Sequence, residues 1–213
     1  FTKIIPCKMY PFQRETYDEV LKTSDDSLDR RSEAVSNFAF PALSDDRKNL
    51  VGLCGKDGID KIKNQLKSHY SNLNKKIGTD IFDDNKESDY MYLTDNGRTL
   101  TGKFMEIDNL KYFSTKFYKA LKNLNRLVWG QKGARTAFVY SNLVKVGIEI
   151  FEQILLQNGY LEYQADADYK INSDTLCYFC GKTYKDHSSN EVSRQQKRQT
   201  KKKQKGGDTS EEL

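Results

Sequence analysis

The chain has 213 residues, of which 37% are hydrophobic, 31% charged and 12% aromatic. This composition can bury a core, which excludes a wholly disordered chain, and no apolar run approaches the roughly 20 residues of a membrane-spanning helix. The formal net charge of +5 permits nucleic-acid binding without demonstrating it, because such binding depends on clustered phosphate contacts. The four cysteines are too dispersed for a disulfide scaffold, so we expect a reducing compartment and no membrane partner.

The chain begins at Phe1 rather than at a methionine, and apolar residues already recur among its first ten positions. We therefore expect it to be an internal part of a longer open reading frame. Within residues 1–21, an extended stretch at residues 3–7 leads into a helix, because apolar side chains then recur at near-helical spacing: Met9, Phe12, Tyr17, Val20 and Leu21.

Residues 22–132 are expected to form an insertion made mainly of helices and loops. An apolar stretch ends at Pro41, which cannot continue a hydrogen-bonded ladder. A polar helix is predicted at about residues 59–70, whereas residues 74–98 show no sustained period and predict little order. Residues 114–128 predict an amphipathic helix. We expect the aromatic residues here to be core residues rather than stacking platforms for bases: Tyr112, Phe113, Phe117 and Tyr118.

The best-defined pattern lies in residues 133–163. It predicts an apolar strand at residues 136–140, a helix at residues 144–157 and a second strand at residues 160–163, with Gly159 as the left-handed residue that ends the helix. Strand, helix and strand within about 30 residues form a βαβ unit, which requires a parallel sheet. The sequence therefore predicts an α/β fold.

Ser141 and Asn142 directly follow the first predicted strand of this unit. In open parallel sheets, ligands bind beyond the carboxyl ends of the strands, near helix starts whose backbone amides favour anions. The two residues could therefore contact a ligand. Alternatively, they cap the following helix, which serine and asparagine stabilise by about 1 kcal/mol. On the residues alone, both interpretations stay open.

A candidate metal site is formed by Cys177 and Cys180, separated by two residues, with His187 following later. A Cys-x-x-Cys pair can direct two thiolates at one zinc ion, and His187 would be a third ligand, whereas a tetrahedral structural site needs four. Two thiols without metal are the alternative. Residues 164–190 are thus a candidate zinc-knuckle insertion. Residues 191–213 carry a basic run and are expected to be a disordered tail, with nonspecific attachment to nucleic acid as the alternative role of that run.

Several short segments occur in an order that resembles a known family. They are Cys-x-Met-x-x-x-Gln at residues 7–13, Ser-Asn-Phe-Ala-Phe-Pro at 36–41, Lys-Asp-Gly at 56–58, Tyr-Phe-Ser-Thr-Lys-Phe at 112–117, Phe-Val-Tyr-Ser-Asn at 138–142 and Gly-Tyr at 159–160. Their ordered succession resembles the superfamily-2 helicases of nucleocytoplasmic large DNA viruses, the group that includes the small subunit of the poxvirus early transcription factor. The resemblance covers about residues 4–187.

By this resemblance, residues 1–21 would open the second RecA-like domain and residues 133–163 would belong to its core, with a family-specific insertion between them. The segment that ends in Tyr-Ser-Asn resembles helicase motif four, whose residues approach the backbone of the bound strand. Ser141 and Asn142 then become candidate nucleic-acid contacts and Lys145 a phosphate neighbour. Such contacts position DNA or RNA without reading its sequence.

The motifs that hydrolyse ATP are missing from the chain, which contains neither a G-x-x-x-x-G-K-[ST] loop nor an Asp-Glu pair after a strand. No catalytic residue is therefore assigned, and ATP and Mg²⁺ are expected only in the complete parent protein. The resemblance implies an ATP-dependent nucleic-acid helicase or translocase that serves viral transcription in the virion or the host cytoplasm. The alternative is a non-catalytic, zinc-bearing interaction module of a viral transcription complex.

Overall fold

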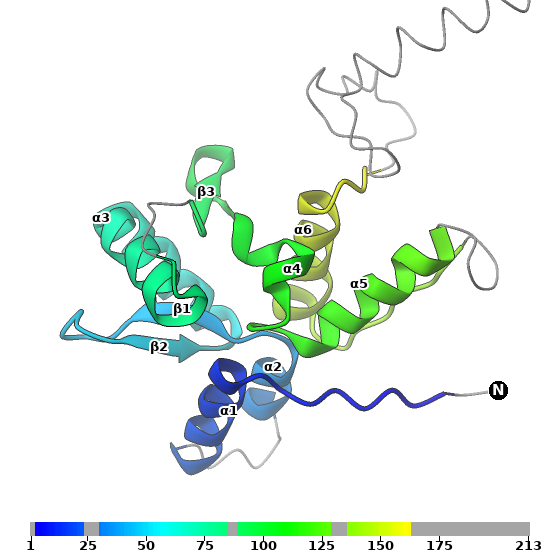
Figure 1. The fold of residues 1–213 in the computed structure, drawn as a ribbon, viewed down its shortest axis with the longest axis horizontal. Helices are drawn as coiled ribbons and strands as arrows, with labels where there is room; N and C mark the ends of the chain where they lie inside the picture. The colour runs from blue at the N-terminus through cyan, green and yellow to red at the C-terminus, as the bar shows by residue number, and fades with distance from the viewer. Residues whose placement is uncertain (1–2, 24–29, 85–88, 129–135, 163–213) are drawn as a thin grey trace, which may run out of the picture. The chain divides into compact units, whose positions relative to one another are not determined.

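The computed structural model describes residues 3–23, 30–84, 89–128 and 136–162. A first unit ends at Asn158 and contains the helices and strands of these residues (Figure 1), whereas residues 159–162, the described part of a second unit, have no regular secondary structure. In chain order the helices and strands are α1 (Pro11–Thr23), α2 (Arg30–Asn37), β1 (Phe40–Leu43), β2 (Leu50–Leu53), α3 (Gly55–Phe82), β3 (Tyr92–Thr94), β4 (Thr99–Thr101), α4 (Ile107–Leu110), α5 (Thr115–Val128) and α6 (Glu149–Gln157). Two 3₁₀ turns, η1 (Asp95–Gly97) and η2 (Lys103–Met105), flank β4, and a π-helical turn, η3 (Val144–Ile148), precedes α6.

The four strands form two antiparallel hairpins. β1 pairs with β2, and β3 pairs with β4. The described part of the chain therefore mixes helices with small antiparallel sheets, and it does not contain the predicted parallel sheet. Residues 136–140 are exposed throughout and adopt no strand, and residues 160–162 adopt none either. The two strand predictions are wrong for this structure because strand-forming side chains express their preference only when a partner strand lies beside them. The expected domain boundaries stay a prediction.

The core of the first unit is built around Phe38, whose side chain is fully buried. Four phenylalanine rings surround it, with centroids 4.5 to 6.4 Å from its own: Phe40, Phe104, Phe113 and Phe117. These rings come from β1, from η2, from the turn before α5 and from α5 itself, so the core joins segments far apart in sequence. The predicted helix at residues 114–128 is confirmed as α5.

α1 confirms the helix predicted in residues 1–21, and Gln13 ties it to two other helices. The Gln13 side chain is fully buried. Its Nε2 donates to the carbonyl oxygens of Val35 at 3.1 Å and Ser36 at 3.3 Å, in α2, and its Oε1 accepts from the Thr115 N–H at 3.1 Å, where α5 begins. One buried side-chain amide therefore fixes the positions of three helices relative to one another, and both its donor and its acceptor atoms have hydrogen-bond partners.

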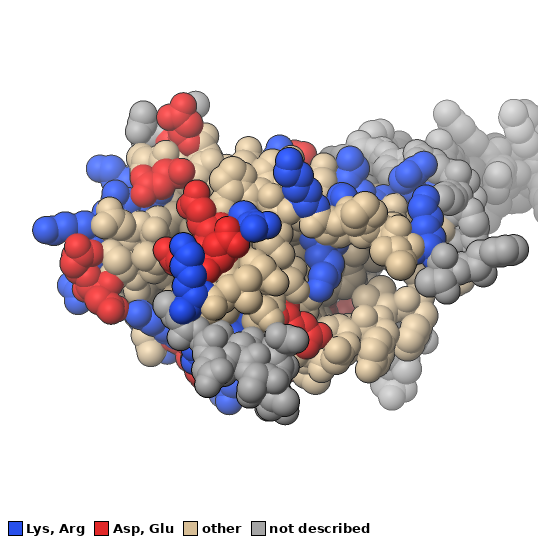
Figure 2. All heavy atoms as spheres, turned by 90° about the horizontal axis from the view of Figure 1, so that it is seen from below, with Lys and Arg blue, Asp and Glu red and all other residues tan. Residues whose placement is uncertain are grey.

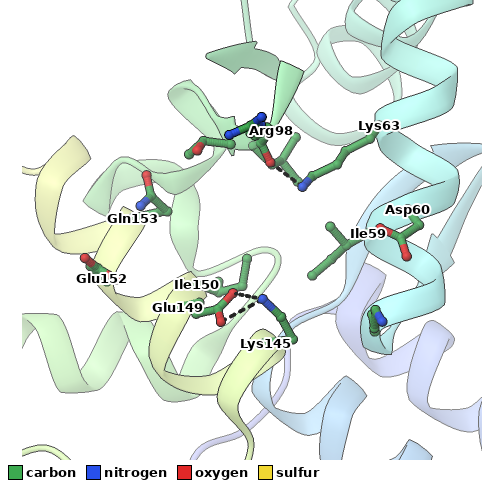
Figure 3. Close-up of a pocket in the computed structure, with 12 residues that line it drawn as sticks. Ile59, Asp60, Lys63, Arg98, Lys145, Glu149, Ile150, Glu152 and Gln153 are labelled. Atoms are coloured by element: carbon green, nitrogen blue, oxygen red, sulfur yellow. Dashed lines mark hydrogen bonds and ion pairs between the residues drawn. The ribbon is translucent and has the colours of Figure 1, made fainter. Parts of the chain in front are cut away.

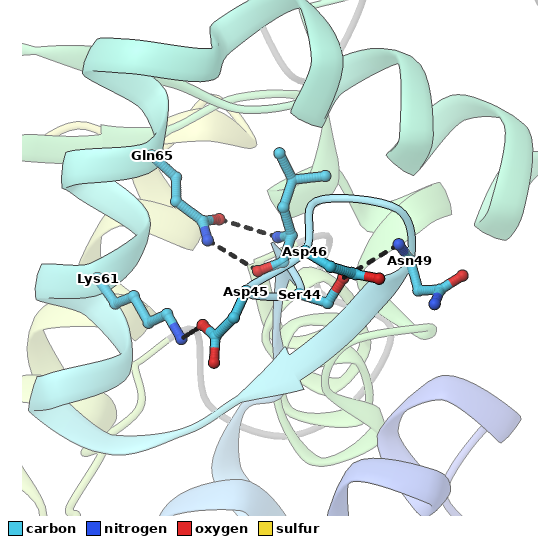
Figure 4. Close-up of polar contacts among 7 residues, drawn as sticks. Ser44, Asp45, Asp46, Asn49, Lys61 and Gln65 are labelled. Carbon is cyan, nitrogen blue, oxygen red and sulfur yellow. Dashed lines mark hydrogen bonds and ion pairs between the residues drawn. The ribbon is translucent and has the colours of Figure 1, made fainter.

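Polar side chains of α3 form hydrogen bonds and an ion pair with the β1–β2 hairpin (Figure 4). Gln65 Oε1 accepts from the Leu43 N–H at 2.9 Å while Gln65 Nε2 donates to the Leu43 carbonyl at 2.8 Å. Lys61 forms an ion pair with Asp45 at 2.8 Å. In the hairpin turn, the hydrogen bond that Asp46 accepts from the Ser44 hydroxyl lowers the pKa of Asp46. The turn therefore favours a charged carboxylate.

β1 includes Pro41 and continues to Leu43, although this proline was expected to be unable to continue a hydrogen-bonded ladder. A two-stranded sheet leaves an open edge on each strand, and a proline without an N–H is tolerated there. Opposite Pro41 lies Gly52, and a Cβ built on Gly52 would lie 1.7 Å from Thr16 Oγ1. The missing side chain therefore lets α1 approach the backbone of β2.

Among the helices, α3 differs most from its predicted length. It has 28 residues and continues past Tyr70 to Phe82, through a kink at His69 where the backbone leaves helical geometry. Beyond the kink, Leu73 and Ile77 are fully buried and extend the face that packs against the core. For residues 74–84 and 89–98, which the structure describes, the expectation of little order is wrong, because this part of the helix and the β3–β4 hairpin stabilise each other.

Asn74 supplies the link between α3 and that hairpin. Its side chain is buried; Oδ1 accepts from the Met91 N–H at 2.8 Å, and Nδ2 donates to the Met91 carbonyl at 2.9 Å. The side-chain amide thus pairs with a backbone as a neighbouring strand would. A polar residue that occupies a core position interrupts the apolar period of the sequence, which is why the helix was expected to end early.

Candidate nucleic-acid interface

Ser141 and Asn142 lie in the turn that precedes η3, and neither is the capping residue. That position is taken by Leu143, with no capping hydrogen bond from its side chain. Ser141 Oγ accepts from the Leu143 N–H at 3.2 Å, and Asn142 Nδ2 donates to Glu33 Oε1 on α2 at 2.9 Å. The two side chains therefore shape the turn and tie it to α2 instead of capping the helix.

The predicted helix at residues 144–157 is confirmed, but it begins with a π-helical turn, η3, before α6. Its predicted stop is also confirmed, since Gly159 has a φ of 85°. Gly147 lies buried in the π turn, and a Cβ built there would lie 2.4 Å from Ser141 Oγ. Glycine at this position therefore lets the turn fold back closely onto the helix.

Lys145 lies at a pocket of about 360 Å³ between α3, β4 and the η3–α6 helix (Figure 3). Lys145 forms an ion pair with Glu149 at 2.9 Å, and on the opposite side Lys63 donates to the Arg98 carbonyl. Cations and carboxylates are mixed in its lining: Lys56, Asp60, Lys63, Arg98, Lys145, Glu149 and Glu152. Because these charges largely cancel, the pocket as a whole has little preference for a phosphate group.

A more uniformly positive surface lies on α5, which the sequence pattern identified only as an amphipathic helix. Residues Thr115–Val128 include no acidic residue, and four basic side chains recur at intervals of three or four positions: Lys116, Lys119, Lys122 and Arg126. This spacing places them on one face of the helix, away from the buried Phe117 and Leu121. The charge spacing alone could have revealed this face.

The space-filling view shows the same asymmetry. Basic side chains predominate on the side where Figure 1 places α5 and the N-terminal segment, whereas acidic side chains gather mainly toward the other side (Figure 2). The described part of the chain therefore offers one broad surface on which a polyanion would meet few carboxylates.

Tyr70, on α3, has a pKa that departs clearly from the ordinary value of a tyrosine. Its hydroxyl donates to Asp89 Oδ1 at 2.5 Å. Burial first, and then this hydrogen bond, raises the pKa of Tyr70 to about 12. The phenol therefore stays protonated near neutral pH and does not act as a base there.

The predicted zinc ligands Cys177, Cys180 and His187 lie outside the described residues, as do residues 191–213. The zinc prediction therefore stays a prediction. Among the residues that the structure does describe, no three His, Cys, Asp or Glu side chains are grouped so that they could hold a metal ion. No helix in this described part is long and apolar enough to cross a membrane.

Comparison with known proteins gives one informative relationship. No protein-family model and no solved structure matches the chain. It is 47% identical over 193 residues to a protein of Acanthamoeba polyphaga mimivirus named "Putative ATP-dependent RNA helicase". The match covers 88% of this chain but 17% of that relative. The chain is therefore homologous to one segment of a much longer viral protein.

Proposed function

We propose that this chain is a segment of a viral ATP-dependent nucleic-acid helicase or translocase. It contributes part of the second motor domain and contacts with the nucleic-acid backbone, while ATP and Mg²⁺ bind elsewhere in the complete protein. The observation that carries the proposal is the 47% identity over 193 residues to the mimivirus protein, whose name describes an ATP-dependent RNA helicase.

The finer parts of the proposal are supported by the order of short segments along the sequence. Their succession from residues 7–13 to residues 159–160 supports membership of superfamily 2 and a relationship to the poxvirus-like group. A role in viral transcription, carried out in the virion or the host cytoplasm, belongs to the same proposal. RNA is the first substrate to test because the name of the mimivirus relative specifies it.

The proposed backbone contacts are made by Ser141, Asn142 and Lys145, and the last two are exposed. Ser141 Oγ accepts from the Leu143 N–H, so its hydroxyl group can still donate to a phosphate oxygen. The Asn142 amide and the Lys145 ammonium can each donate to a phosphate oxygen. Each now bonds to a carboxylate, of Glu33 and Glu149 respectively. Surface interactions of this kind contribute roughly 0–1 kcal/mol, so exchange for a phosphate costs little.

The purified chain is expected to show no ATPase activity above background, with or without RNA, because it lacks both phosphate-handling motifs. The complete parent protein is expected to hydrolyse ATP faster when single-stranded nucleic acid is added. Phosphate release under identical conditions measures both. RNA-stimulated turnover by the chain alone, or no stimulation of the folded parent protein, would contradict the proposed function.

In the complete protein, replacing both Ser141 and Asn142 by alanine is expected to weaken single-strand binding by about thirtyfold, since each lost hydrogen bond contributes about 1 kcal/mol. Unrelated sequences should lose affinity alike, because backbone contacts carry little base information. Fluorescence anisotropy measures binding, and thermal melting of the same variant measures stability.

Glu33→Ala is the matched control for this double variant. It removes the carboxylate to which Asn142 bonds and leaves the amide donor in place. Its affinity is expected to equal or exceed that of the unaltered protein. Unchanged affinity in a destabilised Ser141→Ala/Asn142→Ala variant would show that the two residues serve the turn and not the strand.

A further inference from the structure

We propose that the basic face of α5, together with three tyrosines beside it, binds single-stranded nucleic acid. This inference deepens the proposed helicase function and rests on it, but it concerns a surface separate from Ser141, Asn142 and Lys145. Three observations carry it: uncompensated charge on α5, the course of the N-terminal segment, and the exposure of aromatic rings among the cations.

The first observation is that no carboxylate of the described residues forms an ion pair with the α5 cations. Lys116 Nζ donates to Asn37 Oδ1 at 2.6 Å, and Lys119 Nζ donates to the Pro6 carbonyl. Both acceptors are neutral. Lys122 lies 3.4 Å from the Tyr118 hydroxyl, and none of the α5 cations forms an ion pair with a carboxylate of the described residues. Phosphate groups could therefore approach without displacing an acidic partner.

The second observation is that the positive surface extends beyond the helix. Figure 1 shows the N-terminal segment extending from α1 toward the same side of the molecule as α5, and the hydrogen bond from Lys119 to the Pro6 carbonyl joins the two. This segment carries Lys3 and Lys8, both exposed. The α5 cations alone span about 15 Å along the helix axis, at 1.5 Å per residue. The combined surface is thus long enough to follow several nucleotides.

The third observation concerns the four aromatic residues that the sequence placed in the core. Phe113 and Phe117 are indeed buried, whereas Tyr112 and Tyr118 are only partly buried. The core prediction is therefore correct for the two phenylalanines and wrong for these two tyrosines, whose hydroxyl groups favour positions with access to water. Tyr10, for which no such prediction was made, is exposed.

These tyrosines lie among the cations. The rings of Tyr10 and Tyr112 meet edge to face at 5.4 Å, and Lys111 Nζ lies 6.0 Å from the first centroid and 5.1 Å from the second. Lys122 Nζ lies 5.2 Å from the Tyr118 centroid. Basic groups interleaved with accessible rings suit a single strand, because phosphates pair with the cations and unpaired bases stack on the rings. A duplex keeps its bases stacked inside and cannot use those rings.

The test uses the unaltered 213-residue chain and labelled oligothymidylate and oligouridylate of about 12 nucleotides, a length within the span of typical single-strand sites. Lys122→Glu/Arg126→Glu is expected to weaken binding of both probes about tenfold or more at low salt. The slope of log affinity against log salt should fall in magnitude by about 1.4, since each phosphate contact on a single strand contributes about 0.7.

The matched control is Lys48→Glu/Lys75→Glu, which changes net charge equally at exposed positions in the β1–β2 turn and on α3. It is expected to keep most of the affinity. Tyr118→Ala should weaken binding about fivefold or more, whereas Tyr118→Phe, which preserves the ring, should bind as the unaltered chain does. Circular dichroism checks that every variant is folded.

Three results would overturn the inference: no single-strand binding by the folded chain, an equal loss in the control variant, or a duplex of the same length bound as tightly as the single strand. A preference between the two probes would identify the nucleic acid. The helicase proposal is tested separately by ATP hydrolysis in the complete protein, so failure of the inference can be distinguished from failure of the proposed function.

Discussion

Phe38→Ala is expected to lower the free energy of unfolding by about 3–5 kcal/mol, the usual cost of removing a fully buried phenylalanine side chain. Phe38 has no exposed surface and lies within 6.4 Å of four other rings, measured between centroids, so its loss would leave a cavity that several segments line at once. Because a domain of this size is stable by only about 5–15 kcal/mol, the variant should unfold at much lower urea concentration.

Phe138→Ala is the control, since the same substitution is made where the side chain is 91% exposed. It is expected to change stability by less than about 0.5 kcal/mol. Urea unfolding followed by circular dichroism measures both variants. Similar midpoints for the two would show that the phenylalanine cluster is not the core of this protein.

Gln13→Leu is expected to destabilise the protein by about 3 kcal/mol. The substitution keeps the approximate volume but leaves three backbone groups without their partner, the carbonyls of Val35 and Ser36 and the N–H of Thr115. A backbone group that loses its hydrogen bond in the interior costs roughly 1–3 kcal/mol. Urea unfolding again gives the size of the effect.

Gln65→Leu provides the comparison for this variant. Gln65 also makes hydrogen bonds to a backbone, that of Leu43, but at a partly buried site that water can reach. Its loss is expected to cost about 1 kcal/mol. If Gln13→Leu were no more destabilising than Gln65→Leu, the buried amide would not be what fixes α1, α2 and α5 relative to one another.

The candidate interface could be predicted in part. Ser141, Asn142 and Lys145 were found because they follow an apolar segment and resemble a helicase motif, yet their bonds to Leu143, Glu33 and Glu149 depend on a turn that no local pattern describes. The cations of α5 were visible in the sequence at regular spacing. Their significance required the structure, because only packing shows which tyrosines remain accessible beside them.

The sequence by itself determined α1, α5 and the helix formed by η3 and α6, because each carries apolar side chains at helical spacing. The last of these helices is also followed by Gly159, which favours termination. Only the tertiary structure decided the length of α3, the pairing of β1 with β2 and the exposure of residues 136–140. The helical spacing of apolar side chains is a local feature, complete within a few turns of a single segment. A strand, or a buried amide such as that of Asn74, needs a partner distant in sequence, and the chain's local pattern does not specify which partner it meets.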